Sequence, residues 1–124
     1  MKILVIDPNP IFLRAAYNFI DALPRCECAA AASLTEALDL AATREADVVL
    51  IDYSLRGEGA QHAAPRLKAL APAARMLLMT EDAASYRSSC LAAEADSCVA
   101  KDSLGHYLAQ LVAGHAANCA KECA

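Results

Sequence analysis

With 124 residues and a mass of 13.0 kDa, the chain is expected to form one domain with a core of its own. Its formal net charge is −4 and it has no cluster of lysine or arginine, so we do not expect this polypeptide to bind nucleic acid. About a quarter of the residues are alanine and only 5% are aromatic, which predicts an aliphatic core.

The sequence does not have the features of a secreted or membrane protein. Only four apolar residues lie between Lys2 and Asp7-Pro8, which is too few for a signal peptide. No apolar run approaches the roughly 18 residues that span a bilayer. We therefore expect a cytoplasmic protein without membrane contacts, in which the six cysteines are reduced.

The first half of the chain alternates short apolar runs with helical patterns. Residues 2–7 are predicted to form a strand, and a helix follows from Pro10 to about Leu23, where Pro24 stops it. Four apolar residues share one face of this helix: Ile11, Ala15, Phe19 and Leu23. A run of small residues at 26–32 predicts a second, weaker strand.

The second helix is predicted to begin at Ser33-Leu34-Thr35-Glu36, which has the pattern of a capping box. In such a box the serine and glutamate side chains satisfy backbone donors reciprocally. The helix runs to about Arg44, with Leu34, Leu38 and Ala41 or Ala42 facing the core.

The alternation continues to the end of the chain. Pro65 removes a backbone donor from the third predicted helix, so we expect that helix to start late or to kink. The expected elements are a strand at 48–52, a loop at 54–59, a helix near 60–70, a strand at 75–80, a helix at 83–93, a strand at 97–100 and a helix from about 103 to 117. Five strand-helix units predict an α/β fold with a five-stranded parallel sheet covered on both faces.

Four of the predicted strands end in a reactive polar side chain: Asp7, Asp52, Thr80 and Lys101. The carboxyl ends of parallel strands form the ligand crevice of an open sheet, so we expect these side chains to meet at one rim. Two neighbouring carboxylates repel each other unless a cation lies between them, and Mg2+ prefers such oxygen ligands. A lysine suits a phosphoryl group, and a carboxylate can be its acceptor. The set therefore suits metal-assisted transfer of a phosphoryl group to an aspartate.

With these residues in this order, the chain resembles the receiver domains of two-component response regulators over residues 2 to about 112. The resemblance implies a doubly wound, flavodoxin-like receiver fold with the strand order 2-1-3-4-5. It implies that Asp52, in VVLIDYSLRG, takes a phosphoryl group from a histidine kinase or phosphotransfer protein. The signal would pass through the face formed by the fourth helix, the fifth strand and the fifth helix to an output domain or partner protein, with a homodimer as one possible form.

The resemblance also assigns roles around the acceptor. Thr80 and Lys101 would bind the phosphoryl group, while Asp7, Asp52 and the backbone carbonyl of Ser54 would bind Mg2+. Residues 1–117 would form the receiver domain, and 118–124 a C-terminal tail or the start of a linker.

The chain departs from the family pattern at four positions: Pro8, Arg56, Glu81 and Cys98. Pro8 stands where the family has a second metal-binding acid, and Arg56 where a proline is frequent. Glu81 replaces a small residue beside the phosphoryl site, where it would repel phosphate, turn away or help to bind the metal. Cys98 stands where an aromatic side chain rotates on activation, and a thiol cannot reproduce that packing change.

Simpler interpretations remain for each of these residues. Asp7 and Asp52 are also suited to capping strand ends or the following helices, and threonine at a strand end such as Thr80 is common. Lys101 could also be a solvated surface lysine, and Glu81 is better explained as an exposed loop acid than as a replacement metal ligand.

The cysteines allow a separate interpretation as a metal or redox sensor. His115, Cys119 and Cys123 are spaced by four and share one face of a helical tail. Adjacent pairs at this spacing can bind one ion, but the three together extend over about 12 Å of a straight helix. Cys26 and Cys28 lack the spacing of a zinc knuckle.

Three functions follow from these patterns. The first is a phospho-acceptor receiver, and the second is a receiver fold that acts through protein contacts or dimerisation without phosphorylation. The third is the cysteine-based sensor. An enzyme for a diffusible substrate is not expected, because the chain has only four glycines and no glycine-rich phosphate loop.

Overall fold

A five-stranded parallel sheet organises the computed structural model, which describes residues 1–53, 59–80 and 97–123, with side chains for 1–53, 64–80 and 98–114. The strands are β1 (Lys2–Ile6), β2 (Glu27–Ala31), β3 (Val48–Asp52), β4 (Arg75–Thr80) and β5 (Ser97–Ala100). The helices are α1 (Pro10–Asp21), α2 (Leu34–Thr43), α3 (Gly59–Leu70) and α5 (Leu104–Cys123), with a short 3-10 helix η1 at Lys101–Ser103. The helix predicted at 83–93 lies outside the described residues.

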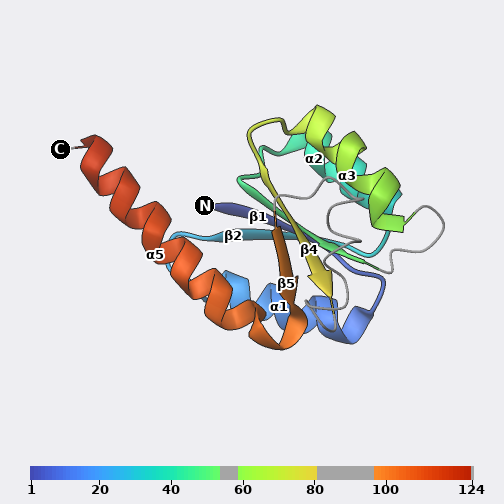
Figure 1. The fold of residues 1–124 in the computed structure, drawn as a ribbon, viewed down its shortest axis with the longest axis horizontal. Coiled ribbons are helices and arrows are strands. Elements are labelled where there is room, and N and C mark those ends of the chain that lie inside the picture. The colour runs from blue at the N-terminus through green and yellow to red at the C-terminus, as the bar shows by residue number, and fades with distance from the viewer. Residues whose placement is uncertain (54–58, 81–96, 124) are drawn as a thin grey trace.

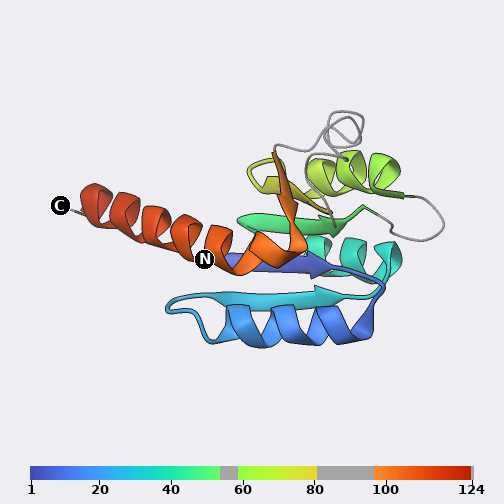
Figure 2. The same ribbon diagram turned by 60° about the horizontal axis from the view of Figure 1, so that its bottom comes forward.

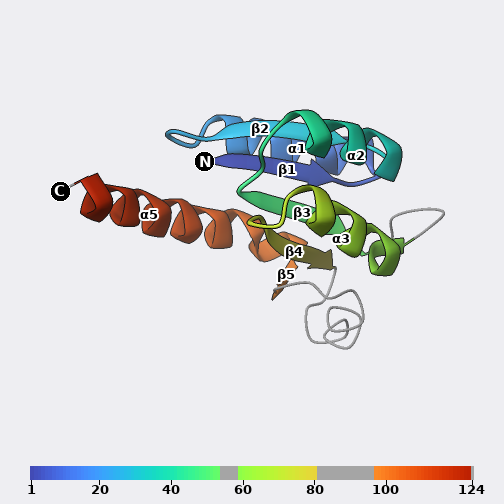
Figure 3. The same ribbon diagram turned by 90° about the horizontal axis from the view of Figure 1, so that it is seen from above.

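The strand order is β2-β1-β3-β4-β5, with every neighbouring pair parallel, as Figure 3 shows from above the sheet. This confirms the predicted α/β fold and the order 2-1-3-4-5. The five strands begin and end within one or two residues of the predicted positions.

The sheet is covered on both faces, because alternate residues of each strand point to opposite sides. Ile3 and Val5 pack toward α1 and α5, whereas Leu4 and Ile6 pack toward α2 and α3. Figures 1 and 2 show α1 on one side of the strands and α2 with α3 on the other. Strands buried on both faces read as continuous apolar runs, as the sequence does here.

Helix α1 buries a different face from the one expected. Ala16 and Ile20 are buried against the sheet, whereas Ile11 is 82% exposed and Phe19 is 43% exposed. The helix is apolar around much of its circumference, so the four-residue spacing of Ile11 and Phe19 did not identify the buried side. The buried residues belong to the neighbouring stripe of the helix, which contains Ala16 and Ile20.

The other helices match the predictions more closely. Ser33 Oγ accepts a hydrogen bond from the backbone N–H of Glu36 at 3.3 Å, as expected for a capping box. In return, Glu36 Oε2 accepts a hydrogen bond from the backbone N–H of Ala32, one residue before the cap, at 2.9 Å. Leu34 and Ala41 are buried, as predicted.

Helix α3 contains Pro65 and begins at Gly59, so of the two expected consequences of this proline, a late start or a kink, the late start does not occur. Pro65 is exposed. The backbone carbonyl that loses its partner therefore lies on the solvent side, where water can satisfy it.

Helix α5 ends at Cys123, beyond the predicted end near residue 117. Leu104 and Leu108 are buried under the sheet, but a Cβ placed on Gly114 would have no neighbour within 4 Å. The helix therefore leaves the sheet and projects past the amino ends of the strands (Figure 1). None of the helices in the described ranges has the length and apolar character to cross a bilayer.

The two isoleucines of α1 give a matched test of this packing. Ile20→Ala should lower the free energy of unfolding by about 2–4 kcal/mol, because it leaves a cavity against the sheet. Ile11→Ala, at an exposed position of the same helix, should change it by less than about 0.5 kcal/mol. Urea unfolding followed by circular dichroism measures both values. Equal losses in the two variants would contradict the observed orientation of α1.

Candidate functional site

Asp7 follows the last residue of β1, and the turn into α1 holds its carboxylate. The side chain is 1% exposed. Oδ1 accepts a hydrogen bond from the backbone N–H of Asn9 at 2.8 Å. Asn9 is the N-cap of α1, and its own side chain accepts from the N–H groups of Ile11 and Phe12. The carboxylate is therefore fixed by the same turn that starts the helix.

Asp52 ends the neighbouring strand β3 and lies beside Asp7. Ile6 pairs with Ile51 across the two strands, so the aspartates that follow them are adjacent at the carboxyl edge. Asp52 is also 1% exposed. In β3, Val48, Leu50 and Asp52 are every second residue, so their side chains point to the same face of the sheet. This is the face that α1 and α5 cover.

Lys101 joins the two carboxylates. It follows β5, and its side chain reaches back past β4 to the ends of β3 and β1. Nζ lies 2.8 Å from Asp7 Oδ2 and 2.8 Å from Asp52 Oδ1. The structure therefore brings together three of the predicted site residues, from three separate strand ends.

The ion pairs determine the charge of Lys101. Burial alone lowers the pKa of its ammonium group, but the contacts with Asp52 and Asp7 and their negative charges outweigh burial and raise the pKa above 10.5. Lys101 is charged at neutral pH. The same ammonium group contacts both buried side chains.

Thr80 lies at the same edge of the sheet but does not join this cluster. It pairs with Ala100, one residue beyond the pair of Asp52 with Met79. Its hydroxyl is fully buried and has no hydrogen-bond partner among the residues that the structure describes. An unpartnered buried hydroxyl is a donor available to a bound group.

The remaining predicted site residues are placed as follows. Ser54 and Glu81 lie outside the described residues, as does Arg56. Pro8 is half-buried directly after Asp7, and Cys98 is half-buried in β5. Sequence reasoning missed Asn9 and Phe12. The N-cap pattern of asparagine before Pro10 identifies Asn9, whereas no pattern in the sequence points to Phe12 beside Lys101.

The donors around Asp7 and Asp52 fit a hard cation. Both side chains offer carboxylate oxygens, which are the ligands that such cations prefer. The fit is limited by Lys101, which is already in contact with one oxygen of each carboxylate. Across the described side chains, no group of three or more His, Cys, Asp or Glu is arranged to bind a metal.

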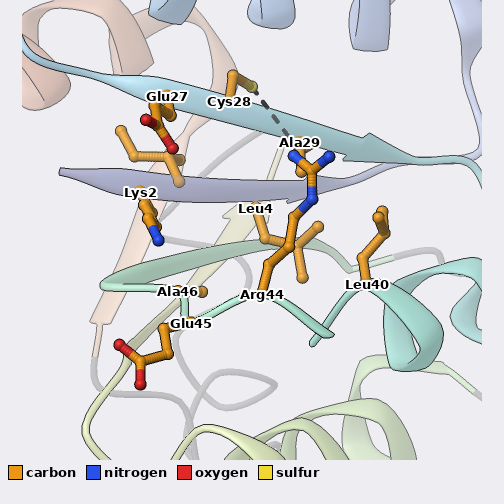
Figure 4. A pocket seen from close by; sticks show the side chains of 10 residues that line it. Lys2, Leu4, Glu27, Cys28, Ala29, Leu40, Arg44, Glu45 and Ala46 are labelled. Carbon is orange, nitrogen blue, oxygen red and sulfur yellow. Dashed lines mark hydrogen bonds between the residues drawn. The ribbon is translucent and has the colours of Figure 1, made fainter. Parts of the chain in front are cut away.

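A separate cavity of about 310 Å³ opens at the opposite end of the sheet, near the start of β1 and β2 (Figure 4). Leu4, Ala29 and Leu40 provide apolar walls, and Arg44 extends over them. The charged residues of the lining, Lys2, Glu27, Arg44 and Glu45, balance each other in sign. This cavity contains none of the predicted site residues.

Burial makes the thiols of Cys26 and Cys28 less reactive. Cys26, Cys28 and Cys98 are free thiols. Burial raises the pKa of Cys28 to about 12, with smaller contributions from Asp21 and Cys26, and burial also raises the pKa of Cys26. The reactive thiolate is therefore disfavoured at both. The side chains of His115, Cys119 and Cys123 lie outside those described.

Removing the ammonium group should destabilise the protein in a pH-dependent way. Lys101→Met should lower the free energy of unfolding by about 3 kcal/mol at pH 7, because two buried carboxylates lose their counter-ion. The pKa of Lys101 is higher in the folded protein, so its stabilisation is complete below about pH 10.5 and is lost as the pH rises through the folded value.

Urea unfolding from pH 7 to 11.5 tests this expectation, with the exposed Lys2→Met as the control. The difference between wild type and Lys101→Met should be constant up to about pH 10 and shrink above it. A difference that grows with alkaline pH, or that Lys2→Met reproduces, would contradict the ion pairs.

Comparisons with known proteins agree with this geometry. The family model described as response regulator receiver domain matches residues 3–113. No curated protein sequence matches the chain. Among solved structures, a two-component response regulator of the LuxR family from Aurantimonas sp. SI85-9A1 is 27% identical, with 94% of this chain and 85% of that chain covered and a TM-score of 0.77.

Two further structures contain ions. A response regulator from Burkholderia pseudomallei, with a phosphorylated aspartic acid, a calcium ion and citrate, is 25% identical (TM-score 0.71); the match covers 81% of this chain but only 59% of that one. The receiver domain of the sensor histidine kinase PA1611 from Pseudomonas aeruginosa PAO1, with magnesium in its active-site cleft, is 21% identical, with coverages of 89% and 92% and a TM-score of 0.75. Since the family model matches most of its length, the chain belongs to the response regulator receiver domain family.

Proposed function

We propose that this receiver domain accepts a phosphoryl group on Asp52 from a histidine kinase or phosphotransfer protein. The observation that carries the proposal is the ammonium group of Lys101, 2.8 Å from both Asp52 and Asp7 at the carboxyl edge of the sheet. A phosphorylated aspartate in the Burkholderia pseudomallei relative supports the same chemistry in this family.

Phosphoryl transfer to Asp52 mainly requires that the reacting groups are positioned and that the negative charge of the phosphoryl group is compensated. An oxygen of Asp52 attacks phosphorus, a new P–O bond forms, and the bond to the donor nitrogen breaks, which leaves an acyl phosphate. The group brings a charge of about −2 at neutral pH. Lys101 is placed to compensate part of that charge, and the Thr80 hydroxyl is available as a donor at the same edge.

Asp7, Asp52 and the backbone carbonyl of Ser54 would hold Mg2+, which would neutralise charge on the phosphoryl oxygens when bound. The magnesium ion in the PA1611 receiver domain supports this assignment. The ammonium group of Lys101 would supply a second positive charge beside the phosphoryl group, in addition to that of Mg2+. The signal would then leave through the face that includes β5 and α5, toward an output domain or a partner protein.

A receiver that acts without phosphorylation is the alternative. It is favoured by Pro8, which has no carboxylate, and by the contact of Lys101 with both aspartates, which already neutralises part of the site. Such a domain would act through protein contacts or dimerisation.

Incubation with acetyl phosphate, with and without Mg2+, separates the two functions. We expect a single Mg2+-dependent phosphoryl adduct by intact-protein mass spectrometry, located on Asp52. Asp52→Asn should abolish the adduct, whereas Asp39→Asn, at an exposed position of α2, should keep it. An adduct that persists in Asp52→Asn would contradict the assignment, and no adduct from acetyl phosphate or from a panel of phosphorylated histidine donors would favour the alternative.

Restoring an acid at position 8 should strengthen metal binding. Pro8→Asp adds a carboxylate next to Asp7, so we expect the Kd for Mg2+ to fall by roughly tenfold or more, measured by titration calorimetry or NMR shifts. Pro10→Asp adds the same charge at an exposed position in the first turn of α1 and should have a much smaller effect. If both variants lower the Kd equally, the added negative charge strengthens Mg2+ binding wherever it is placed. That result would contradict a metal-ligand role for an acid at position 8.

A further inference from the structure

The ring of Phe12 lies against the ammonium group of Lys101. Nζ is 4.5 Å from the ring centroid, within the roughly 6 Å at which a cation–π contact is significant. Phe12 is half-buried in the first turn of α1, on the face of the sheet to which Asp7 and Asp52 also turn. The ammonium group therefore contacts the ring of Phe12 as well as the carboxylates of Asp7 and Asp52.

The start of α1 fixes the ring in this place. Asp7 accepts a hydrogen bond from the N–H of Asn9, and the Asn9 side chain accepts one from the N–H of Phe12 at 3.3 Å. The residue that holds the Asp7 carboxylate thus also holds the backbone of Phe12. The Asp7 carboxylate and the backbone of Phe12 are therefore held by the same turn.

Lys101 needs such a support because its side chain is long. It starts after β5 and crosses the end of β4 before it reaches β3 and β1. An extended lysine loses much rotamer freedom in one position. Its side chain is nevertheless only 14% exposed, which shows that the surroundings enclose it.

We propose that Phe12 is a positioning residue that holds Lys101 on the Asp7 and Asp52 carboxylates as an internal counter-ion. This inference rests on the proposed site at Asp52. A divalent cation competes with Lys101 for the same two carboxylates, so the ring that stabilises the lysine there weakens cation binding. Pro8 adds no carboxylate beside Asp7, so among the described side chains the cation and Lys101 compete for Asp7 and Asp52.

Phe12→Leu tests the inference, because leucine keeps an apolar side chain and removes the aromatic face. Two readouts are measured on the full chain: the Kd for Mg2+ by titration, and the labelling of Lys101 by a trace of acetic anhydride relative to the exposed Lys2, by peptide mass spectrometry. We expect the Kd to fall and the relative labelling to rise, each by about 3- to 10-fold, because the lysine leaves the carboxylates more often.

Two variants control for general effects on α1. Phe12→Tyr keeps an aromatic ring and should match wild type in both readouts. Phe19→Leu makes the same replacement on the same helix at a ring that is 43% exposed and lies near the backbone of Gly105, and it should also match wild type. If Phe12→Leu is indistinguishable from Phe19→Leu in either readout, Phe12 does not hold Lys101 as a counter-ion and the inference is overturned.

Neither readout requires phosphorylation. A wild-type protein that gives no phosphoryl adduct would overturn the proposed function while both readouts still decide the role of Phe12. Conversely, a normal adduct with unchanged labelling in Phe12→Leu would overturn only the role of Phe12.

Discussion

The contact of one lysine with two buried aspartates is the interaction on which the site depends. Two carboxylates that are each 1% exposed repel each other strongly in a medium of low dielectric constant. Lys101 lies 2.8 Å from both and removes most of that cost. The same contact therefore stabilises the folded protein and holds two carboxylates together at the carboxyl edge of the sheet.

The fold creates this contact through three geometric facts. β1 and β3 are neighbours, which places Asp7 beside Asp52. Strand alternation turns both aspartates to the face covered by α1 and α5. The turn at Asn9 then brings the first turn of α1, with Phe12, against the ammonium group. The residues of the candidate site come from chain segments far apart in sequence, as is usual at the carboxyl edge of a doubly wound sheet.

The sheet and three of the site residues were predictable from sequence because short apolar runs ending in Asp7, Asp52 and Lys101 specify parallel strands and their carboxyl ends. The buried face of α1 was not predictable, because Ile11 and Phe19 have the same helical spacing along an apolar stripe as the residues that include Ala16 and Ile20. The length of α5 was missed since its alanine-rich end contains no residue that stops a helix. The contact of Phe12 with Lys101 depends on packing between distant segments, which has no signature in local sequence.

Pro8 gives the site its individual character, because Lys101 must balance a smaller set of acids than the family pattern provides. The most direct test is a double-mutant cycle with Asp52→Asn, Lys101→Met and the double variant, measured by urea unfolding at pH 7. A coupling free energy of at least about 1.5 kcal/mol is expected for a desolvated charge pair. A coupling below about 0.5 kcal/mol would mean that Lys101 does not stabilise Asp52 and would contradict the central role of this contact.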